Sequence, residues 1–194
     1  TSCIEVSCGG QRVIFDCGTG LRNFGHWMMK KGVRRADILM SHSHWDHING
    51  FPFFSPAFKA DCEFRIMAGH LFEMKENLHD IMSGQMNQPT FPVPIEAMQA
   101  KLTFEDFVAG DSFTLGDGIK VSTTLLRHPD NATGYRIDYA GKSFCYITDT
   151  EHVPGKPDEN ILQLIDHADI VVYDCTYTES GRAAGRGRGE VRGG

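Results

Sequence analysis

The first hundred residues alternate between short apolar runs, spaced as in strands, and longer segments in which apolar residues recur with helical spacing. The helical spacing predicts one helix over residues 21–31, closed by Gly32, and a second over residues 71–82. A Pro-rich stretch at 89–94 and a short helix at 95–99 follow, and prolines do not pair into a central sheet. Strands are predicted at residues 2–6, 12–17, 37–40 and 63–67.

The second half of the chain is dominated by strand-like runs, with one helix predicted at 161–167. The order of elements favours an α+β fold in which two mixed, mainly antiparallel sheets pack together with helices outside. The strands of this half are predicted at residues 102–107, 112–115, 119–126, 134–139, 143–147 and 169–173.

The length of 194 residues, the hydrophobic fraction of 41% and the aromatic fraction of 10% support one globular domain in this chain. We assign residues 1–178 to this domain. Residues 179–194 are rich in Gly and Arg and lack apolar periodicity, which predicts a disordered tail. An RNA-binding Arg-Gly segment is one interpretation of the tail. The other, which the acidic balance of the chain favours, is a stretch that does not belong to the fold.

The formal net charge of -6 argues against general affinity for nucleic-acid backbones or anionic membranes, so there is no strong nucleic-acid signature. We find no apolar run long enough to span a membrane and no signal-peptide pattern. Six scattered cysteines without a Cys-x-x-Cys pair fit reduced structural thiols, and we expect a cytoplasmic protein. The oligomeric state stays open, a dimer included.

The densest set of metal-ligand side chains follows the predicted strand at 37–40 and consists of His42, His44, Asp46 and His47. Imidazole nitrogen and carboxylate oxygen both suit Zn²⁺. Four ligands exceed the three that a catalytic zinc takes from protein, which indicates a shared or dinuclear centre. In an extended segment His42 and His44 point the same way, and a turn at Trp45 directs the other two toward a second ion.

Two further ligands stand at predicted strand exits, His128 and Asp149. Pro129 biases His128 toward extended geometry. A carboxylate at Asp149 could bridge two ions, which an imidazole does not do. Either residue taken alone would be an ordinary surface residue. For the string at 42–47 the alternative is a polar loop or a chance cluster, which the occurrence of three of the nine His within six positions disfavours.

Together these motifs resemble the metallo-β-lactamase superfamily. Asp16 before Gly18-Thr19-Gly20, then the string at 42–47, then His128 and Asp149 follow one another in the family's order. The resemblance runs from residue 1 to about residue 178. It implies an αββα sandwich with the metal site at the edge between the sheets.

The resemblance also implies a role for each motif residue. His42, His44 and His128 would hold one metal, Asp46 and His47 the second, and Asp149 would bridge them. Asp16 is similar to the family's carboxylate that braces the ligand loop. Ser41 and Ser43 are expected to serve only the turn, and surface or satisfied core roles are expected for His26, His70, His79 and His167.

The amino-acid sequence around the motifs narrows the resemblance to a bacterial branch similar to the phosphonate-pathway phosphodiesterase and to ribonuclease Z-like proteins. Trp45 and residues 48–54, 85–94 and 148–152 carry this likeness. Two departures stand out. The family's first strand has no counterpart before Thr1, and no His follows His167, so the second metal site is expected to be one ligand short.

We therefore expect a metallohydrolase that cleaves a small-molecule or nucleotide-like phosphodiester with water activated by one or two Zn²⁺ ions and oriented by Asp46 and Asp149. Mn²⁺ or Fe²⁺ could replace Zn²⁺. The alternatives are a carboxyl-ester, lactone or thioester hydrolase on the same scaffold, and a catalytically impaired metal-binding domain. His152 is either a substrate-facing group, a replacement ligand or an exposed loop residue. Phe51 either walls the substrate pocket or anchors the core.

Overall fold

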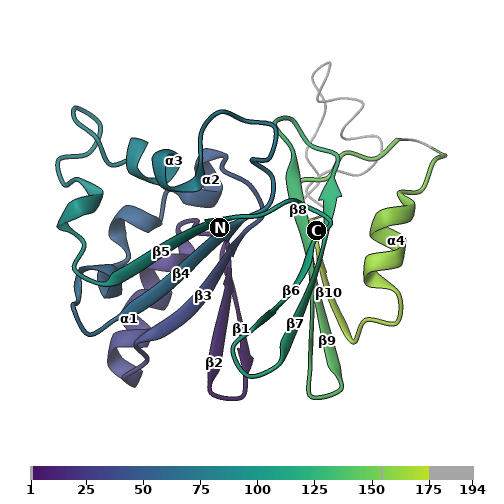
Figure 1. Ribbon diagram of the computed structural model, residues 1–194, viewed down its shortest axis with the longest axis horizontal. Helices are drawn as coiled ribbons and strands as arrows, with labels where there is room; N and C mark the ends of the chain where they lie inside the picture. Colours follow the sequence, from purple (N-terminus) through teal and green to yellow (C-terminus); the bar gives the residue numbers. More distant parts are fainter. Residues whose placement is uncertain (1, 154, 175–194) are drawn as a thin grey trace, which may run out of the picture.

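Two five-stranded sheets lie face to face in the computed structural model, which describes residues 2–153 and 155–174 (Figure 1). The first sheet has the order β1-β2-β3-β4-β5 and the second β10-β9-β8-β7-β6. The strands of the first sheet are β1 (Ile4–Cys8), β2 (Gln11–Phe15), β3 (Arg35–Met40), β4 (Glu63–Ala68) and β5 (Lys101–Asp106). Those of the second are β6 (Ser112–Leu115), β7 (Ile119–Leu126), β8 (Ala132–Tyr139), β9 (Lys142–Ile147) and β10 (Ile170–Tyr173).

Helices cover the outer face of each sheet, which confirms the expected α+β sandwich. Figure 1 shows the helices of the first half beside the first sheet and the last helix beside the second. The α-helices are α1 (Gly20–Lys31), α2 (Trp45–Ile48), α3 (Leu78–Gly84) and α4 (Glu159–Ile165). Short 3-10 helices are η1 (Phe51–Phe53), η2 (Ser55–Phe58) and η3 (Ile95–Ala97). None of the helices in the described part of the chain is long and apolar enough to cross a membrane.

The sheets are mixed, as expected, but antiparallel pairs do not predominate in the first one. Only β1 and β2 pair antiparallel there, while β2, β3, β4 and β5 run parallel to one another. A helix or helical segment connects each of these parallel neighbours, and a parallel pair requires such a crossover. The buried run Ile38-Leu39-Met40 fits this arrangement, because a strand covered on both faces is apolar at successive positions.

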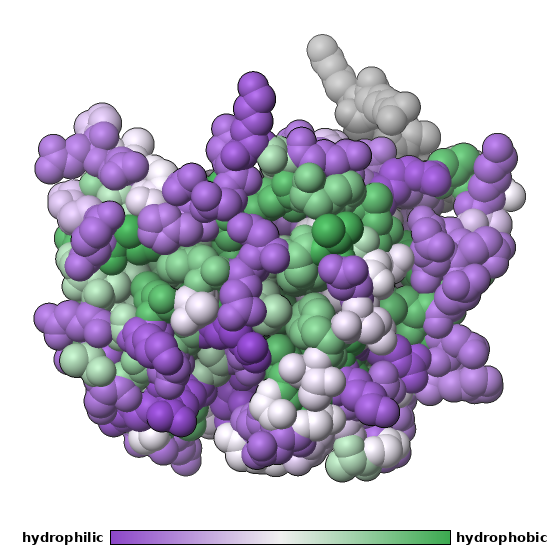
Figure 2. Space-filling model, viewed as in Figure 1, coloured by the Kyte–Doolittle hydropathy of each residue, from purple (hydrophilic) through white to green (hydrophobic). Residues whose placement is uncertain are grey.

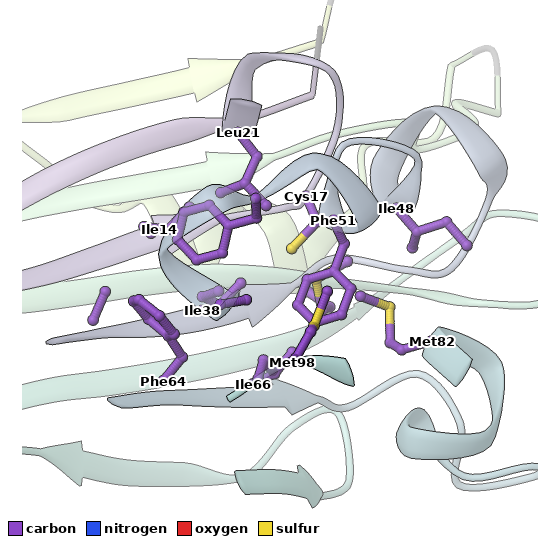
Figure 3. Packing of buried hydrophobic residues seen from close by; sticks show 14 of the residues in the cluster. Ile14, Cys17, Leu21, Ile38, Ile48, Phe51, Phe64, Ile66, Met82 and Met98 are labelled. Carbon is purple, nitrogen blue, oxygen red and sulfur yellow. The ribbon is translucent and has the colours of Figure 1, made fainter. Parts of the chain in front are cut away.

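Three apolar clusters hold the layers together. Ile14, Ile38 and Ile66 point from the first sheet toward its helices, where they meet Leu21 and Phe51 (Figure 3). Between the sheets, Phe15 packs against aromatic rings of β8 and β9 at centroid distances of 5.2–5.6 Å. A third cluster joins the second sheet to α4. Each fully buried large side chain contributes about 1.5–3 kcal/mol to folding.

Helix α3, which the pattern predicts over residues 71–82, is shorter than predicted. It begins at Leu78, because the side chain of Asn77 accepts a hydrogen bond from the Asp80 backbone N–H at 2.9 Å. The Asp106 carboxylate also accepts from the Leu78 N–H at 3.2 Å, which holds this end against β5. Residues 71–77 are therefore turns and bends, and Met74 is 38% exposed rather than part of a buried stripe.

Polar and apolar residues are unevenly spread over the face in Figure 2. Hydrophobic residues gather along the middle of this face, and hydrophilic residues lie toward both flanks. The five described cysteines are not joined by disulfides, in line with the reduced thiols expected from their spacing. The Gly/Arg-rich segment 179–194 lies outside the described residues.

Candidate metal centre

The ligand loop leaves the C-terminal end of β3 and enters α2 at Trp45. His44 is extended, with φ -61° and ψ 151°, so His42 and His44 project to the same side of the loop as the strand periodicity requires. Their ring centroids lie 4.6 Å apart. Asp46 and His47 follow in the first turn of α2 and project toward a second group of ligands.

Three imidazoles converge at the first group. The His44 Nδ1 lies 3.1 Å from the His42 Nε2 and 3.0 Å from the His128 Nε2. His128 follows β7, so the geometry joins residues 84 positions apart in the chain. Potential ligand atoms of these three residues all lie within 4.8 Å of one another.

Hydrogen bonding on the far side of the His42 ring identifies its tautomer. The Ser41 hydroxyl lies 2.8–2.9 Å from both oxygens of the Asp16 carboxylate, which only accepts, so the hydroxyl donates there. The Ser41 Oγ, 3.0 Å from the His42 Nδ1, then accepts the Nδ1–H. The lone pair of the His42 Nε2 consequently faces the other imidazoles. Burial, followed by the charge of His47, lowers the pKa of His42 to about 2.

This donor set fits a divalent cation. The outward Nε2 of His44 lies 3.6 Å from a carboxylate oxygen of Asp130, which favours a proton on that nitrogen and a lone pair on Nδ1. Two lone pairs facing each other at 3.1 Å repel unless a positive charge lies between them. An imidazole whose second nitrogen is hydrogen-bonded, as that of His42 is to Ser41, is the usual ligand of such an ion.

The second group is built around His47. Its Nε2 lies 2.9 Å from the Asp149 Oδ2 and 3.2 Å from the Asp46 Oδ2. The Ser2 hydroxyl is also 3.2 Å from this nitrogen. Burial alone lowers the pKa of His47, but its hydrogen bonds to Asp149 and then Asp16 outweigh burial and raise the pKa to about 10. The proton on Nε2 occupies the position, among carboxylates, where a cation would be held.

Asp149 belongs to the second group of ligands, which includes His42 as well as His47. Its potential ligand atom lies within 4.8 Å of those of His42 and His47. Burial raises the pKa of Asp149, but hydrogen bonds from His47 and Thr148 hold it well below its ordinary range. Asp149 has a positive φ of 54°, a conformation that Asp adopts more readily than most residues.

Asp16 fixes the ligand loop from beneath. It is completely buried at the end of β2 and accepts from the Ser41 backbone N–H at 2.7 Å and from the His47 Nδ1 at 2.8 Å. The Tyr146 hydroxyl of β9 donates to the same carboxylate at 2.8 Å. Burial, followed by the charge of Asp16, raises the pKa of Tyr146 well above its ordinary value, so the hydroxyl keeps the proton that it donates.

The remaining predicted site residues lie elsewhere. Phe51 is 0% exposed and packs in the core 6.5 Å from the Phe104 ring, so the structure favours the core anchor over the pocket wall. His152 is exposed, and its Nε2 lies 2.9 Å from the Tyr173 hydroxyl with the two rings stacked at 15°.

Sequence reasoning missed several side chains that hold the centre. Ser41 was expected to serve only the turn, but it is fully buried and connects Asp16 to the His42 ring. Tyr146 is 130 positions from Asp16, and nothing in its strand pattern indicates that contact. Asp130 was missed for the same reason, although its position two residues after the predicted ligand His128 was a usable signal.

Two helix-covered sheets with a His- and Asp-rich centre at one edge define a metallo-β-lactamase fold. The chain belongs to the β-lactamase superfamily, because the family model described as "Beta-lactamase superfamily domain" matches residues 11–188. Ribonuclease Z of Haloarcula marismortui is 23% identical over 223 residues, covering 92% of this chain and 69% of that protein. Ribonuclease Z of Macrococcus caseolyticus is 25% identical over 213 residues, covering 86% and 66%.

Solved structures agree in fold. Human tRNase Z, short form, superposes with a TM-score of 0.63 at 17% identity, covering 92% of this chain and 72% of that one. The metallo-β-lactamase fold protein YhfI from Bacillus subtilis gives 0.62 at 16% identity, covering 91% and 64%. Zn²⁺-bound PqqB from Methylobacterium extorquens gives 0.60 at 15% identity, covering 90% and 60%. The chain thus spans roughly two thirds of the length of its relatives.

Proposed function

We propose that this chain carries the centre of a metal-dependent hydrolase that cleaves phosphodiesters. The observation that carries the proposal is the convergence of two ligand groups on His42, one with His44 and His128 and the other with His47 and Asp149. Adjacent groups of this kind suit a dinuclear centre. The make-up of the two groups agrees with this. The first group consists of three imidazoles, and in the second the carboxylates of Asp46 and Asp149 lie beside His47.

The residues that would hold the metal are those of the two groups, together with Asp46. A bound divalent ion supplies Lewis acidity that activates water and neutralises charge on a phosphoryl group. Zn²⁺ suits the nitrogen-rich first group, and the related fold of PqqB is known in a Zn²⁺-bound form. Mn²⁺ and Fe²⁺ also accept imidazole and carboxylate ligands, so metal identity is part of what must be measured.

Two carboxylates are our candidates for orienting the attacking water. Asp46 has a 73% exposed side chain and Asp149 a 30% exposed one, so both are accessible from the solvent side. His47, by contrast, is buried and held by Asp16, which suits a ligand better than a group that moves protons to solvent. We assign the catalytic roles to Asp46 and Asp149.

The choice of a phosphodiester rests on the relatives. Two proteins similar to most of this chain are named ribonuclease Z, which supports nucleic-acid-type substrates as candidates. The net charge of -6 argues against general nucleic-acid affinity, but it does not exclude a site that binds one phosphodiester at a metal centre. A nucleotide-like phosphodiester satisfies both observations.

The test is hydrolysis by purified, metal-reconstituted protein. Turnover of bis-p-nitrophenyl phosphate and of a short RNA should fall at least about 100-fold in His42→Ala and in Asp149→Asn. His26→Ala, an exposed residue of α1, is the matched control and should retain turnover. Turnover of a thioester or lactone without any phosphodiester cleavage would replace the proposal with the carboxyl-ester reaction. Metal binding without turnover of any of these substrates would contradict hydrolysis by this chain.

A further inference from the structure

We propose that His70 is a positioning residue of the ligand loop, which acts through Ser43 to hold His42 and His44 in metal-binding geometry. The inference rests on the metal centre of the proposed function. It concerns a histidine to which neither the ligand motif nor the comparisons assign a role.

The contact is direct and buried. The His70 Nε2 lies 3.1 Å from the Ser43 Oγ, and the His70 side chain is almost fully enclosed, with the residue 1% exposed. Ser43 stands between the two ligands, and in an extended segment its side chain projects opposite to theirs. His70 therefore lies behind the loop and supports it from the side away from the ligand atoms.

The two ends of the ligand loop are held by other hydrogen bonds, and its middle is held by the contact between Ser43 and His70. Ser41 is fixed by Asp16, and its carbonyl accepts from the Thr133 N–H at 2.8 Å. His44 is fixed by the start of α2, where its carbonyl accepts from the His47 N–H at 2.9 Å. Ser43, at the middle of the loop, is held by the hydrogen bond between its hydroxyl and the His70 ring.

His70 is itself held rigidly. The backbone before it continues the pairing of β4, since the Phe107 N–H donates to the Ala68 carbonyl and the Ala109 N–H donates to the Gly69 carbonyl, both at 2.9 Å. Because the backbone just before His70 is paired in this way, the His70 ring has a fixed position relative to the first sheet and holds the loop in register with it. Rotating the loop would break the contact rather than carry His70 along.

The protonation of His70 agrees with a bracing role. Burial, followed by the charge of His44, lowers the pKa of His70 to about 4, so the ring is neutral at neutral pH. Within residues 2–153 and 155–174 its Nδ1 is buried without a hydrogen-bond partner. A buried N–H without a partner is rarer in native structures than a buried acceptor without one, which favours a proton on Nε2 and donation to Ser43. The neutral ring therefore contributes a directional hydrogen bond to Ser43 and no charge.

Zn²⁺ affinity measured by competition with a chromophoric chelator tests the inference without any substrate. His70→Phe keeps the ring volume and removes the hydrogen bond, while Ser43→Ala removes its partner. Each should raise the Kd for Zn²⁺ about 10- to 100-fold, the range typical of residues that orient metal ligands. The double variant should bind Zn²⁺ no more weakly than the worse single variant, because both substitutions remove one interaction. His70→Gln, which restores an N–H, should recover part of the loss.

His26→Phe is the matched control, and the melting temperature of each metal-free variant shows whether the fold is retained. Co²⁺ absorption should reveal the change at the three-imidazole group. A Kd within twofold of wild type in a folded His70→Phe, or additive losses in the double variant, would overturn the inference. Should His70→Phe not fold, the Kd of Ser43→Ala decides alone by the same twofold limit. Wild-type protein that binds Zn²⁺ but hydrolyses nothing would defeat the proposed function and leave this result standing, whereas wild-type protein that binds no divalent ion would overturn both.

Discussion

The Asp16 carboxylate lies 2.8 Å from the His47 Nδ1, and both side chains are almost completely buried, at 0% and 2% exposure. Asp16 directly follows β2, whereas His47 lies in α2, which the ligand loop connects to the neighbouring strand β3. This contact fixes which ring nitrogen of His47 faces the second group of ligands. It also places a negative charge beneath the centre, where only protonated or metal-bound partners balance it.

Asp16→Asn should weaken metal binding while leaving the loop folded. Asn tolerates the positive φ of 61° at this position and keeps one carbonyl acceptor, but it cannot accept from His47, Ser41 and Tyr146 as a carboxylate does. We expect an increase of about 10- to 100-fold in the metal Kd by isothermal titration. Asp61→Asn, which alters an exposed ion pair, should leave the Kd unchanged. Equal affinities for the two variants would contradict this role of Asp16.

His128→Ala should lower the metal content of the protein, because His128 is a predicted ligand, whereas His152→Ala should not. The first removes a nitrogen that faces His44 at 3.0 Å, so elemental analysis should show the loss of at least one bound ion per chain. The second removes a ring that stacks on Tyr173, and it should leave metal content unchanged. Loss of metal in His152→Ala would make this residue a ligand and would revise the second group.

Gly50→Ala should disrupt the fold beneath the ligands. A Cβ at this position would overlap the Gly18 carbonyl oxygen, where the Gly50 N–H donates to the Cys17 carbonyl at 2.7 Å. Overpacking of this kind destabilises by about 1–3 kcal/mol or more. Gly84→Ala is the control, because nothing lies within 4 Å of its added Cβ and Ala favours a helix by roughly 0.5–1 kcal/mol. Urea unfolding should rank Gly84→Ala above wild type and Gly50→Ala well below it. The reverse order would show that Gly18 and Gly50 are not in close contact.

Asp169→Asn should reduce the acid sensitivity of the second sheet. Hydrogen bonds from Lys142 and from the backbone and hydroxyl of Ser143 lower the pKa of the Asp169 carboxyl from 3.8 to about 2. Because the folded-state pKa is the lower one, the stabilisation is complete above about pH 4 and is lost as the pH falls through 2. The melting temperature of the variant should be lower than wild type at pH 6 and should decline less steeply between pH 4 and 2. Asp117→Asn, in an exposed turn, should decline as wild type does, and identical slopes for all three proteins would refute the assignment.

Added Zn²⁺ should stabilise the wild-type fold, because the folded chain brings the ligands together and the unfolded chain does not. At a free concentration 100 times the Kd the gain is about 2.7 kcal/mol, measurable as an increase in melting temperature that EDTA reverses. In His42→Ala, which removes a member of both ligand groups, the increase should be lost or greatly reduced. An unchanged melting temperature in wild-type protein with saturating Zn²⁺ would contradict a metal centre in this chain.

The local pattern was sufficient for most elements and for the motif, because strand and helix periodicities and the ligand string depend on neighbouring residues. It placed α1 and the strands of the second sheet within a few residues of their observed bounds. It predicted that α3 begins too early in the chain. The cap at Asn77 and the hydrogen bond from the Leu78 N–H to Asp106 decide where α3 begins, and Asp106 is distant in sequence. The parallel order of the first sheet also depends on pairings between strands that are far apart in the chain.

By itself the sequence determined which side chains could bind a metal, their order along the chain and, through the resemblance, the family to which they belong. Tertiary structure alone decided that Tyr146 and Ser41 share the Asp16 carboxylate, that Phe51 is a core residue, and that His70 lies behind Ser43. The physical reason is that a hydrogen bond acts over about 3 Å. Such contacts join residues 25 to 130 positions apart, and only the packing of the two sheets brings those residues within that distance.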